Sequence, residues 1–153
     1  MTIRKIISTL TASAALALSL LGAAQPAQAA AAGGELRNKD TGLCVDRREV
    51  ADLPVIAFTT TCNGSAKQRW VYSPSDHTIR TTDGRCLSTA SSTGVFVDPC
   101  DSGLLVRWGP TADGRIHQLD WGIGCLEDYR TEWLTWGACD NHTNEIWTSL
   151  PTA

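Results

Sequence analysis

Six cysteines carry the most reactive side chains of this 153-residue chain. None of them forms a C-x-x-C pair, and an even number in an exported chain is typical of disulfides rather than metal ligands. The sequence therefore predicts a protein held by disulfides, with no metal and no cofactor. All six lie beyond residue 43, so the segment before them has to be examined separately.

That first segment has the features of an export signal. Residues 1–29 combine a basic start, an apolar stretch over 12–21 and a run of small residues that ends at Ala29. This pattern predicts a secretory signal peptide, followed by a short tail over 30–34. The apolar stretch is shorter than the roughly 20 residues that a spanning helix needs, so we expect no membrane span in the mature chain. We expect a secreted, extracellular monomer.

Charge and motifs exclude two classes of function. The formal net charge is −3 at pH 7, and the signal segment takes Arg4 and Lys5 away with it, which leaves the mature chain more acidic. Phosphate-backbone affinity comes from clustered Lys and Arg, so we expect no nucleic-acid partner. The chain has no G-x-S-x-G, H-E-x-x-H or P-loop motif, and the adjacent Glu127 and Asp128 would point to opposite faces of a strand. We expect no enzymatic activity.

A threefold repeat organises the cysteines. Every second cysteine is followed eight residues later by a tryptophan, as in Cys62 and Trp70, Cys100 and Trp108, and Cys139 and Trp147. Pairing the cysteines within each repeat gives three short loops with the same geometry. We therefore predict the bridges Cys44–Cys62, Cys86–Cys100 and Cys125–Cys139.

The repeat unit has the pattern of β-structure. Asp83 and Gly84 stand between short alternating runs, which predicts a hairpin with a type I′ turn and positive φ at both central residues. No long window keeps the apolar spacing of a helix. Each unit alone would expose unpaired strand edges, so we predict an all-β fold in which three repeats close on one another.

The first repeat resembles a known family. It contains the run 42–46 (Gly-Leu-Cys-Val-Asp) and then Gln68-Arg69-Trp70, and it is similar to the ricin B-chain type lectin domain with its Gln-x-Trp signature. The resemblance covers about residues 35–150. It implies a β-trefoil of twelve strands with pseudo-threefold symmetry. Three tryptophans would then belong to the core: Trp70, Trp108 and Trp147.

The resemblance also implies a carbohydrate partner and shallow pockets, one per repeat. In this family an acidic residue after the first cysteine and an Asn–Gln pair near the tryptophan hydrogen-bond sugar hydroxyls, while an aromatic ring stacks on the pyranose. Carboxylates, amides and flat rings suit such a ligand. The candidate contacts in this chain are Asp46, Gln68, Glu127, Trp136 and Asn144.

Every repeat departs from the family pattern. Thr60 and Gly137 stand where the stacking ring is expected, and Glu145 stands where the third repeat should have Gln. Ser88 replaces the acidic residue of the second repeat, and we predict that this site does not bind sugar. The third repeat is the strongest candidate and the first repeat follows it.

Other interpretations of the same residues stay open. Asp46 and Glu127 could instead cap turns, because such carboxylates commonly accept from nearby backbone N–H groups. Gln68 could instead hydrogen-bond the backbone at the repeat junction. The surplus tryptophans could instead pack against the hairpins; they are Trp121, Trp133 and Trp136. A trefoil that has lost its sugar affinity and binds or inhibits a secreted protein is the alternative function.

Overall fold

The computed structural model describes residues 33–49, 51, 54–89, 94–103, 107–120, 122, 124–130 and 134–153. The predicted signal peptide over 1–29 lies outside the described residues, as do Trp121 and Trp133. Within the described part, no helix is long and apolar enough to cross a membrane.

Short strands make up nearly all of the regular structure of the described residues. Two single 3-10 turns, η1 (Ala66–Gln68) and η2 (Thr143–Glu145), are the exceptions. The strands are β1 (Gly34–Glu35), β2 (Arg37–Asn38), β3 (Cys44–Arg48), β4 (Ile56–Thr60), β5 (Arg69–Ser73), β6 (Thr78–Thr81), β7 (Arg85–Thr89), β8 (Val95–Pro99), β9 (Trp108–Pro110), β10 (Ile116–Gln118), β11 (Gly124–Glu127), β12 (Thr135–Ala138) and β13 (Trp147–Thr148). Because β1 and β2 are one strand interrupted at Leu36, the set corresponds to the twelve strands expected of a trefoil.

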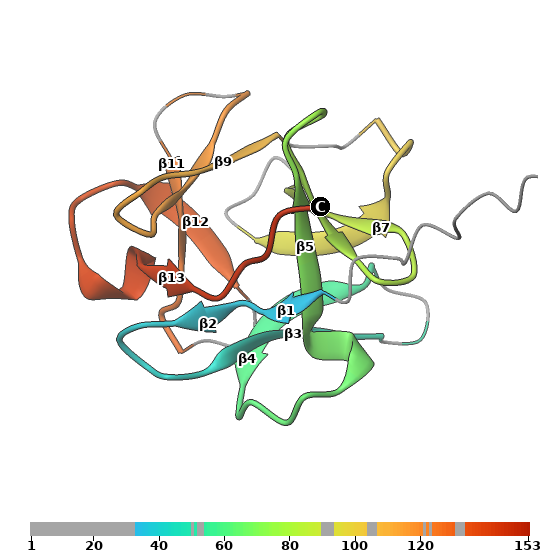
Figure 1. The fold of residues 1–153 in the computed structure, drawn as a ribbon, viewed down its shortest axis with the longest axis horizontal. Coiled ribbons are helices and arrows are strands. Elements are labelled where there is room, and N and C mark those ends of the chain that lie inside the picture. The colour runs from blue at the N-terminus through green and yellow to red at the C-terminus, as the bar shows by residue number, and fades with distance from the viewer. Residues whose placement is uncertain are drawn as a thin grey trace, which may run out of the picture.

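Antiparallel pairing joins the strands into two sheets. One sheet has the order β1-β5-β6-β7-β8-β4-β3-β2-β13 and the other β12-β11-β10-β9. In Figure 1 the first repeat, in blue to green, lies below, and the third, in orange to red, lies to one side. Backbone hydrogen bonds from Leu134 to Ala57 and from Val95 to Leu134 connect the hairpins of different repeats. The all-β fold with three repeats is confirmed.

Three tryptophans occupy equivalent places in the core, as predicted. Trp70 and Trp108 are fully buried and Trp147 is 4% exposed. Each indole N–H donates to the carbonyl just after the first cysteine of its repeat: Trp70 to Val45 at 2.9 Å, Trp108 to Leu87 at 3.0 Å and Trp147 to Leu126 at 2.9 Å. The equal spacing in sequence therefore reflects one hydrogen-bonded unit used three times.

The disulfides pair within repeats, as the spacing predicted. Cys44 is bridged to Cys62, Cys86 to Cys100 and Cys125 to Cys139, with Cα atoms 5.0–5.1 Å apart. Each bridge joins the start of one strand to the segment after the next strand. It therefore ties down the hairpin on which the candidate residue of that repeat is carried.

The hairpin at Asp83 and Gly84 is confirmed, but the predicted type I′ turn is wrong. β6 pairs with β7, and Arg80 lies opposite Cys86. Only Gly84 has a positive φ, of 86°, and its N–H donates to the Thr81 carbonyl at 3.0 Å. Asp83 instead accepts a hydrogen bond from the Thr81 hydroxyl. The hydrogen bond between the Thr81 and Asp83 side chains holds the turn in a form that needs one residue with positive φ rather than two.

Hydrogen-bonded backbone structure runs from Gly34 to the C-terminal residues. β1 begins at Gly34, and the C-terminal residues lie along β5, where the Tyr72 N–H donates to the Pro151 carbonyl at 2.8 Å. The Ala153 N–H donates back to Tyr72 at the same distance. These contacts cover an edge of β5 that would otherwise be unpaired.

Candidate functional site

The third repeat holds an open pocket at the end of β11. It has a volume of about 350 Å³, and its lining includes Glu127, Tyr129, Gly137 and Asp140. Glu127 lies opposite Thr135 on β12 and is 3% exposed. Its carboxylate lies over Gly137, where an added Cβ would be only 2.6 Å from Glu127 Oε1. The acid therefore occupies the space that a side chain at position 137 would need.

Tyr129 supplies the exposed ring that Gly137 lacks. Its side chain is 56% exposed, and it lines one pocket with Glu127 and a neighbouring pocket with Asn144. The predicted site residues Glu127 and Asn144 thus lie in two pockets that share a tyrosine, which the sequence pattern did not single out. Its position two residues after Glu127, on the same face of an extended segment, is the signal that could have found it.

The pKa of Glu127 is raised above its usual value. Burial is the main cause because it disfavours the charged form, and the carboxylates of Glu145 and Asp140 add repulsion. The hydrogen bond with Tyr129 works in the opposite direction. Glu127 is therefore held in an environment that favours its protonated form more than water does.

Glu145 takes the place of the signature glutamine and changes its partners. Gln68 Oε1 accepts from the Asn63 N–H at 2.8 Å in the first repeat, and Glu145 Oε1 accepts from the Asp140 N–H at 2.8 Å in the third. Glu145 Oε2 forms an ion pair with Arg115 Nε at 3.1 Å. Glu145 thus accepts the same backbone hydrogen bond in the third repeat that Gln68 accepts in the first. Glu145 has no amide N–H, so Glu127 lacks the donor that Gln68 provides to Asp46.

Trp136 borders the pocket but packs mainly toward the protein interior. It lies opposite Leu126, a core residue, and its ring closes off the space above Gly124, where a Cβ would meet it at 2.6 Å. The ring is partly buried against the core cluster. The pleat places Trp136 on the other face of β12 from Gly137. Tyr129 is therefore the ring better exposed to a ligand.

The first repeat brings its two predicted residues into direct contact. Gln68 Nε2 donates to Asp46 Oδ2 and to the Thr61 carbonyl, each at 3.0 Å, and Gln68 is fully buried. Asp46 is 6% exposed and also accepts from the Arg47 N–H at 2.7 Å. Both N–H groups of the amide are thus used within the protein. Phe58 lies opposite Asp46 on β4 and is the nearby ring on that face.

In the second repeat the acidic position is occupied by a fully buried serine. The Ser88 hydroxyl donates to the Asp98 carboxylate on β8. The second repeat therefore has its carboxylate on β8, at Asp98, instead of at the acidic position on β7. Leu105 and Val106, which stand at the amide positions of this repeat, lie outside the described residues.

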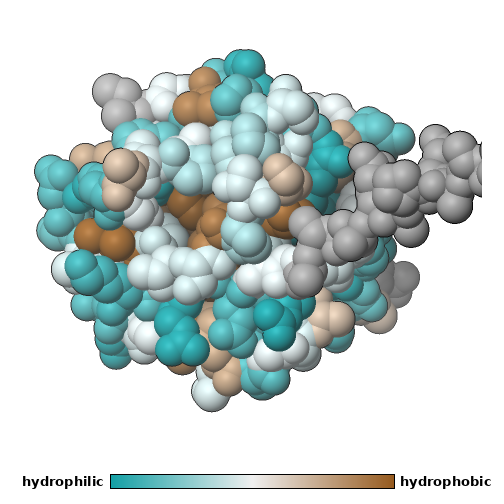
Figure 2. Space-filling view, viewed as in Figure 1, coloured by the Kyte–Doolittle hydropathy of each residue, from teal (hydrophilic) through white to brown (hydrophobic). Residues whose placement is uncertain are grey.

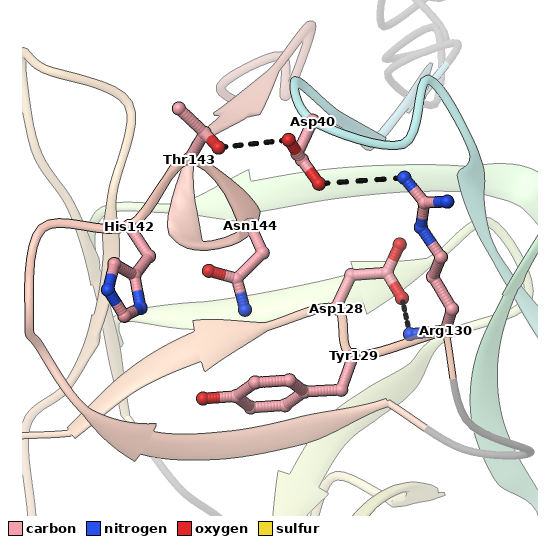
Figure 3. Close-up of a pocket in the computed structure, with 7 residues that line it drawn as sticks. All are labelled: Asp40, Asp128, Tyr129, Arg130, His142, Thr143 and Asn144. Atoms are coloured by element: carbon pink, nitrogen blue, oxygen red, sulfur yellow. Dashed lines mark hydrogen bonds and ion pairs between the residues drawn. The ribbon is translucent and has the colours of Figure 1, made fainter.

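A second pocket of about 270 Å³ also has Tyr129 in its lining (Figure 3). It is lined by three segments: the turn after β2, the loop after β11, and η2 with the residue before it. Its residues are Asp40, Asp128, Tyr129, Arg130, His142, Thr143 and Asn144. Tyr129 lines both pockets, so the two pockets are neighbours.

Among the described residues, two clusters have the types and spacing of metal ligands. Each contains both cysteines of a disulfide: His117 with Cys125 and Cys139, and Glu35 with Cys44 and Cys62. A disulfide offers no thiolate, so neither cluster has the donor set of a metal centre.

Comparison with known proteins supports the fold and identifies the family. A search of curated proteins finds no match. Among solved structures, the β-trefoil lectin of a Vibrio vulnificus hemolysin/cytolysin with N-acetyl-D-lactosamine bound is 14% identical, with a TM-score of 0.64, and 79% of this chain matches 94% of that one. A non-toxic homologue of type II RIPs from Momordica charantia (bitter gourd), in complex with α-methyl-D-galactoside, is 24% identical, with a TM-score of 0.60, and 76% of this chain matches 46% of that one.

GalNAc-T7, solved with UDP, GalNAc and Mn²⁺, is 18% identical, with a TM-score of 0.64. There 77% of this chain matches only 22% of the other, so this chain spans less than a quarter of that protein. At these identities the neighbours show the trefoil fold alone. The model of the ricin-type beta-trefoil lectin domain, however, matches residues 32–147, which is most of the chain. The chain therefore belongs to the ricin-type beta-trefoil lectin domain family.

Proposed function

We propose that this protein is a secreted carbohydrate-binding module whose principal site is the Glu127 pocket of the third repeat. The observation that carries the proposal is the buried Glu127 carboxylate on an open pocket, beside the exposed Tyr129, which also lines the neighbouring pocket that contains Asn144. A lectin-type domain fits a binding role rather than a catalytic one.

The arrangement suits the hydroxyl groups and the C–H face of a sugar ring. An ionised Glu127 can accept hydrogen bonds from two neighbouring hydroxyls, Asn144 offers an amide, and Tyr129 offers a ring to stack on. Burial of Glu127 strengthens hydrogen bonds to its charged form because the surroundings have a low dielectric constant. A shallow site of this kind should bind a monosaccharide at about −4 to −6 kcal/mol, in the high micromolar to millimolar range.

A weaker contribution is proposed for the first repeat. Asp46 keeps lone pairs beyond those used by Gln68 and Arg47, and Phe58 lies opposite it. Two pockets on one molecule would raise retention on a polymer, because the second contact forms at a raised effective concentration.

The surface bears on the alternative of a protein partner. In the view of Figure 2 the molecule is largely hydrophilic, with hydrophobic residues in small patches and in a hollow near the centre. Protein-docking surfaces often present a larger contiguous apolar patch. This face is therefore better suited to a polar ligand, and a protein partner remains an outcome of the test.

A glycan array with the exported protein tests the proposal. We expect an N-terminus near Ala30, and hits that include neutral glycans. Galactosides and N-acetyl-D-lactosamine belong on the array because two structural neighbours hold such sugars. Glu127→Gln should lower the affinity for the best hit about tenfold or more, since a hydrogen bond that a sugar hydroxyl donates to a charged carboxylate is among the strongest that it can form. Ser88→Ala, in the second repeat, is the control and should change nothing.

Two results would refute the proposal. One is an array on which the wild type binds no glycan while the protein copurifies with a secreted protein, which would support the alternative function. The other is equal glycan affinity of the wild type and Glu127→Gln, which would place the site elsewhere.

A further inference from the structure

The two pockets of the third repeat are neighbours that share Tyr129 in their linings. One pocket contains Glu127 and the other contains Asp40 and Thr143, while Tyr129 lines both. In Figure 3 the Asn144 side chain points toward the Tyr129 ring from the opposite wall. A ligand that stacks on this ring in the Glu127 pocket therefore has a second polar recess directly beside it.

The walls of the second pocket are held rigid by contacts between the first and third repeats. Asp128, which is 4% exposed, accepts hydrogen bonds from the Thr41 hydroxyl at 2.7 Å and from the Thr59 hydroxyl at 2.9 Å. The Asn144 carbonyl accepts from the Asn38 side chain at 2.7 Å. A pocket fixed in this way loses little entropy on binding, which favours affinity.

The turn that presents Tyr129 is fixed as well. Arg130 has a φ of 58°, a left-handed conformation that is uncommon outside glycine. The Arg130 N–H donates to Asp128 Oδ1 at 2.9 Å, which holds the backbone in that conformation. The backbone that carries Tyr129 is thereby held in place beside both pockets.

The exposed groups of the second pocket match hydroxyls rather than a charged ligand. Asp40 Oδ1 accepts from the Thr143 hydroxyl at 2.9 Å, and Asp40 Oδ2 lies 3.6 Å from the Arg130 guanidinium. Acidic groups on this wall are therefore offset by the Arg130 cation. The Asp40 and Arg130 side chains are 43% and 66% exposed, so both can turn to a ligand. Such a mixture of acceptors and donors suits a neutral polyhydroxyl group.

We infer that the second pocket is a subsite for the next sugar unit of an oligosaccharide, so that the third repeat binds at least a disaccharide across Tyr129. The inference rests on the proposed function and specifies its ligand. The first unit occupies the Glu127 pocket, and the second unit contacts Asp40 and Thr143. The recognised class is a neutral oligosaccharide rather than a single sugar.

Calorimetry with matched probes tests the subsite. The probes are the methyl glycosides of galactose, glucose, xylose and N-acetylglucosamine, and the disaccharides lactose, cellobiose, xylobiose and chitobiose. For the best pair, we expect the disaccharide to bind about tenfold tighter than the methyl glycoside. Asp40→Asn and Thr143→Val should each weaken the disaccharide about two- to tenfold, the range for loss of one hydrogen bond, and leave the methyl glycoside unchanged.

Two control variants separate this inference from the proposed function. Asp101→Asn makes the same charge change on an exposed turn of the second repeat and should affect no probe. Glu127→Gln should weaken both members of the best pair. Equal affinity for both members, or a disaccharide preference that survives Asp40→Asn and Thr143→Val, would overturn the subsite while leaving the proposed function in place. Failure of every probe to bind would overturn both.

Discussion

The third repeat combines a long side chain at Glu127 with no side chain at Gly137, and the dependence of one on the other can be measured as a coupling free energy. In the third repeat a long acid lies over a glycine, whereas in the first repeat the shorter Asp46 is combined with Thr60 at the equivalent place. A Cβ at Gly137 would stand 2.6 Å from Glu127 Oε1 and 3.1 Å from Glu127 Cδ. The Gly137→Ala variant therefore forces the buried carboxylate to move.

The expected loss of stability follows from this overlap. Adding a methyl group to a packed site costs about 1–3 kcal/mol. Glu127→Asp shortens the side chain by one methylene and withdraws the carboxylate from Gly137. In that background, Gly137→Ala should cost little, which gives a coupling of about 1–2 kcal/mol, within the range for residues in direct contact.

Urea denaturation of the wild type, the two single variants and the double variant measures this coupling. Gly109→Ala is the matched control, because its closest contact would be a terminal methyl of Leu119 at 2.9 Å, on a side chain that is 42% exposed. It shares the change in unfolded-state entropy, about 0.4–1 kcal/mol, that any glycine-to-alanine substitution brings. If the two single variants add without coupling, Glu127 does not occupy the space over Gly137 and the reasoning is wrong.

Three further predictions concern pH, the disulfides and the core. The pKa of Glu127 is raised above 4.5, so the folded state holds this proton more tightly than the unfolded chain, and wild-type stability should fall relative to Glu127→Gln as pH rises through the folded pKa. Urea denaturation at several pH values should show a difference in unfolding free energy between the wild type and Glu127→Gln that changes with pH and then becomes constant. The change is worth about 1.4 kcal/mol for each unit by which the Glu127 pKa, measured by NMR, is raised, and a difference independent of pH would contradict the raised pKa. Replacing Cys86 and Cys100 together by Ser opens a loop with a separation of 14 residues and should cost about 3 kcal/mol in urea, while a loss below about 1 kcal/mol would show that the bridge hardly restricts the unfolded chain. Trp108→Phe removes the indole N–H that donates to the buried Leu87 carbonyl and leaves a cavity, so we expect a loss of about 2–4 kcal/mol by the same assay, and a neutral result would deny the tryptophan its structural role.

The sequence by itself determined the features that repeat along the chain. The disulfide pairing follows from equal spacings, the all-β class from short alternating runs and turn residues, and the three core tryptophans from the resemblance to the lectin family. The Asp83–Gly84 hairpin was also predictable, although its turn type was not, because the Thr81 side chain selects it.

The tertiary structure decided which candidate residues face a ligand. Gln68 and Asp46 have the right types, but whether an amide binds sugar or backbone depends on what surrounds it, and Gln68 donates both N–H groups inside the protein. Tyr129 became a candidate only because it lines both the pocket that contains Glu127 and the pocket that contains Asn144.

The second pocket is formed by residues that lie far apart in the sequence. Asp40 and Thr143 are separated by 103 positions and meet because closure of the trefoil brings the first repeat beside the third. A local pattern of residue types describes one repeat at a time and contains no information on contacts between repeats. Those contacts are set by packing around the shared core, and they form the wall that gives the third repeat its second recess.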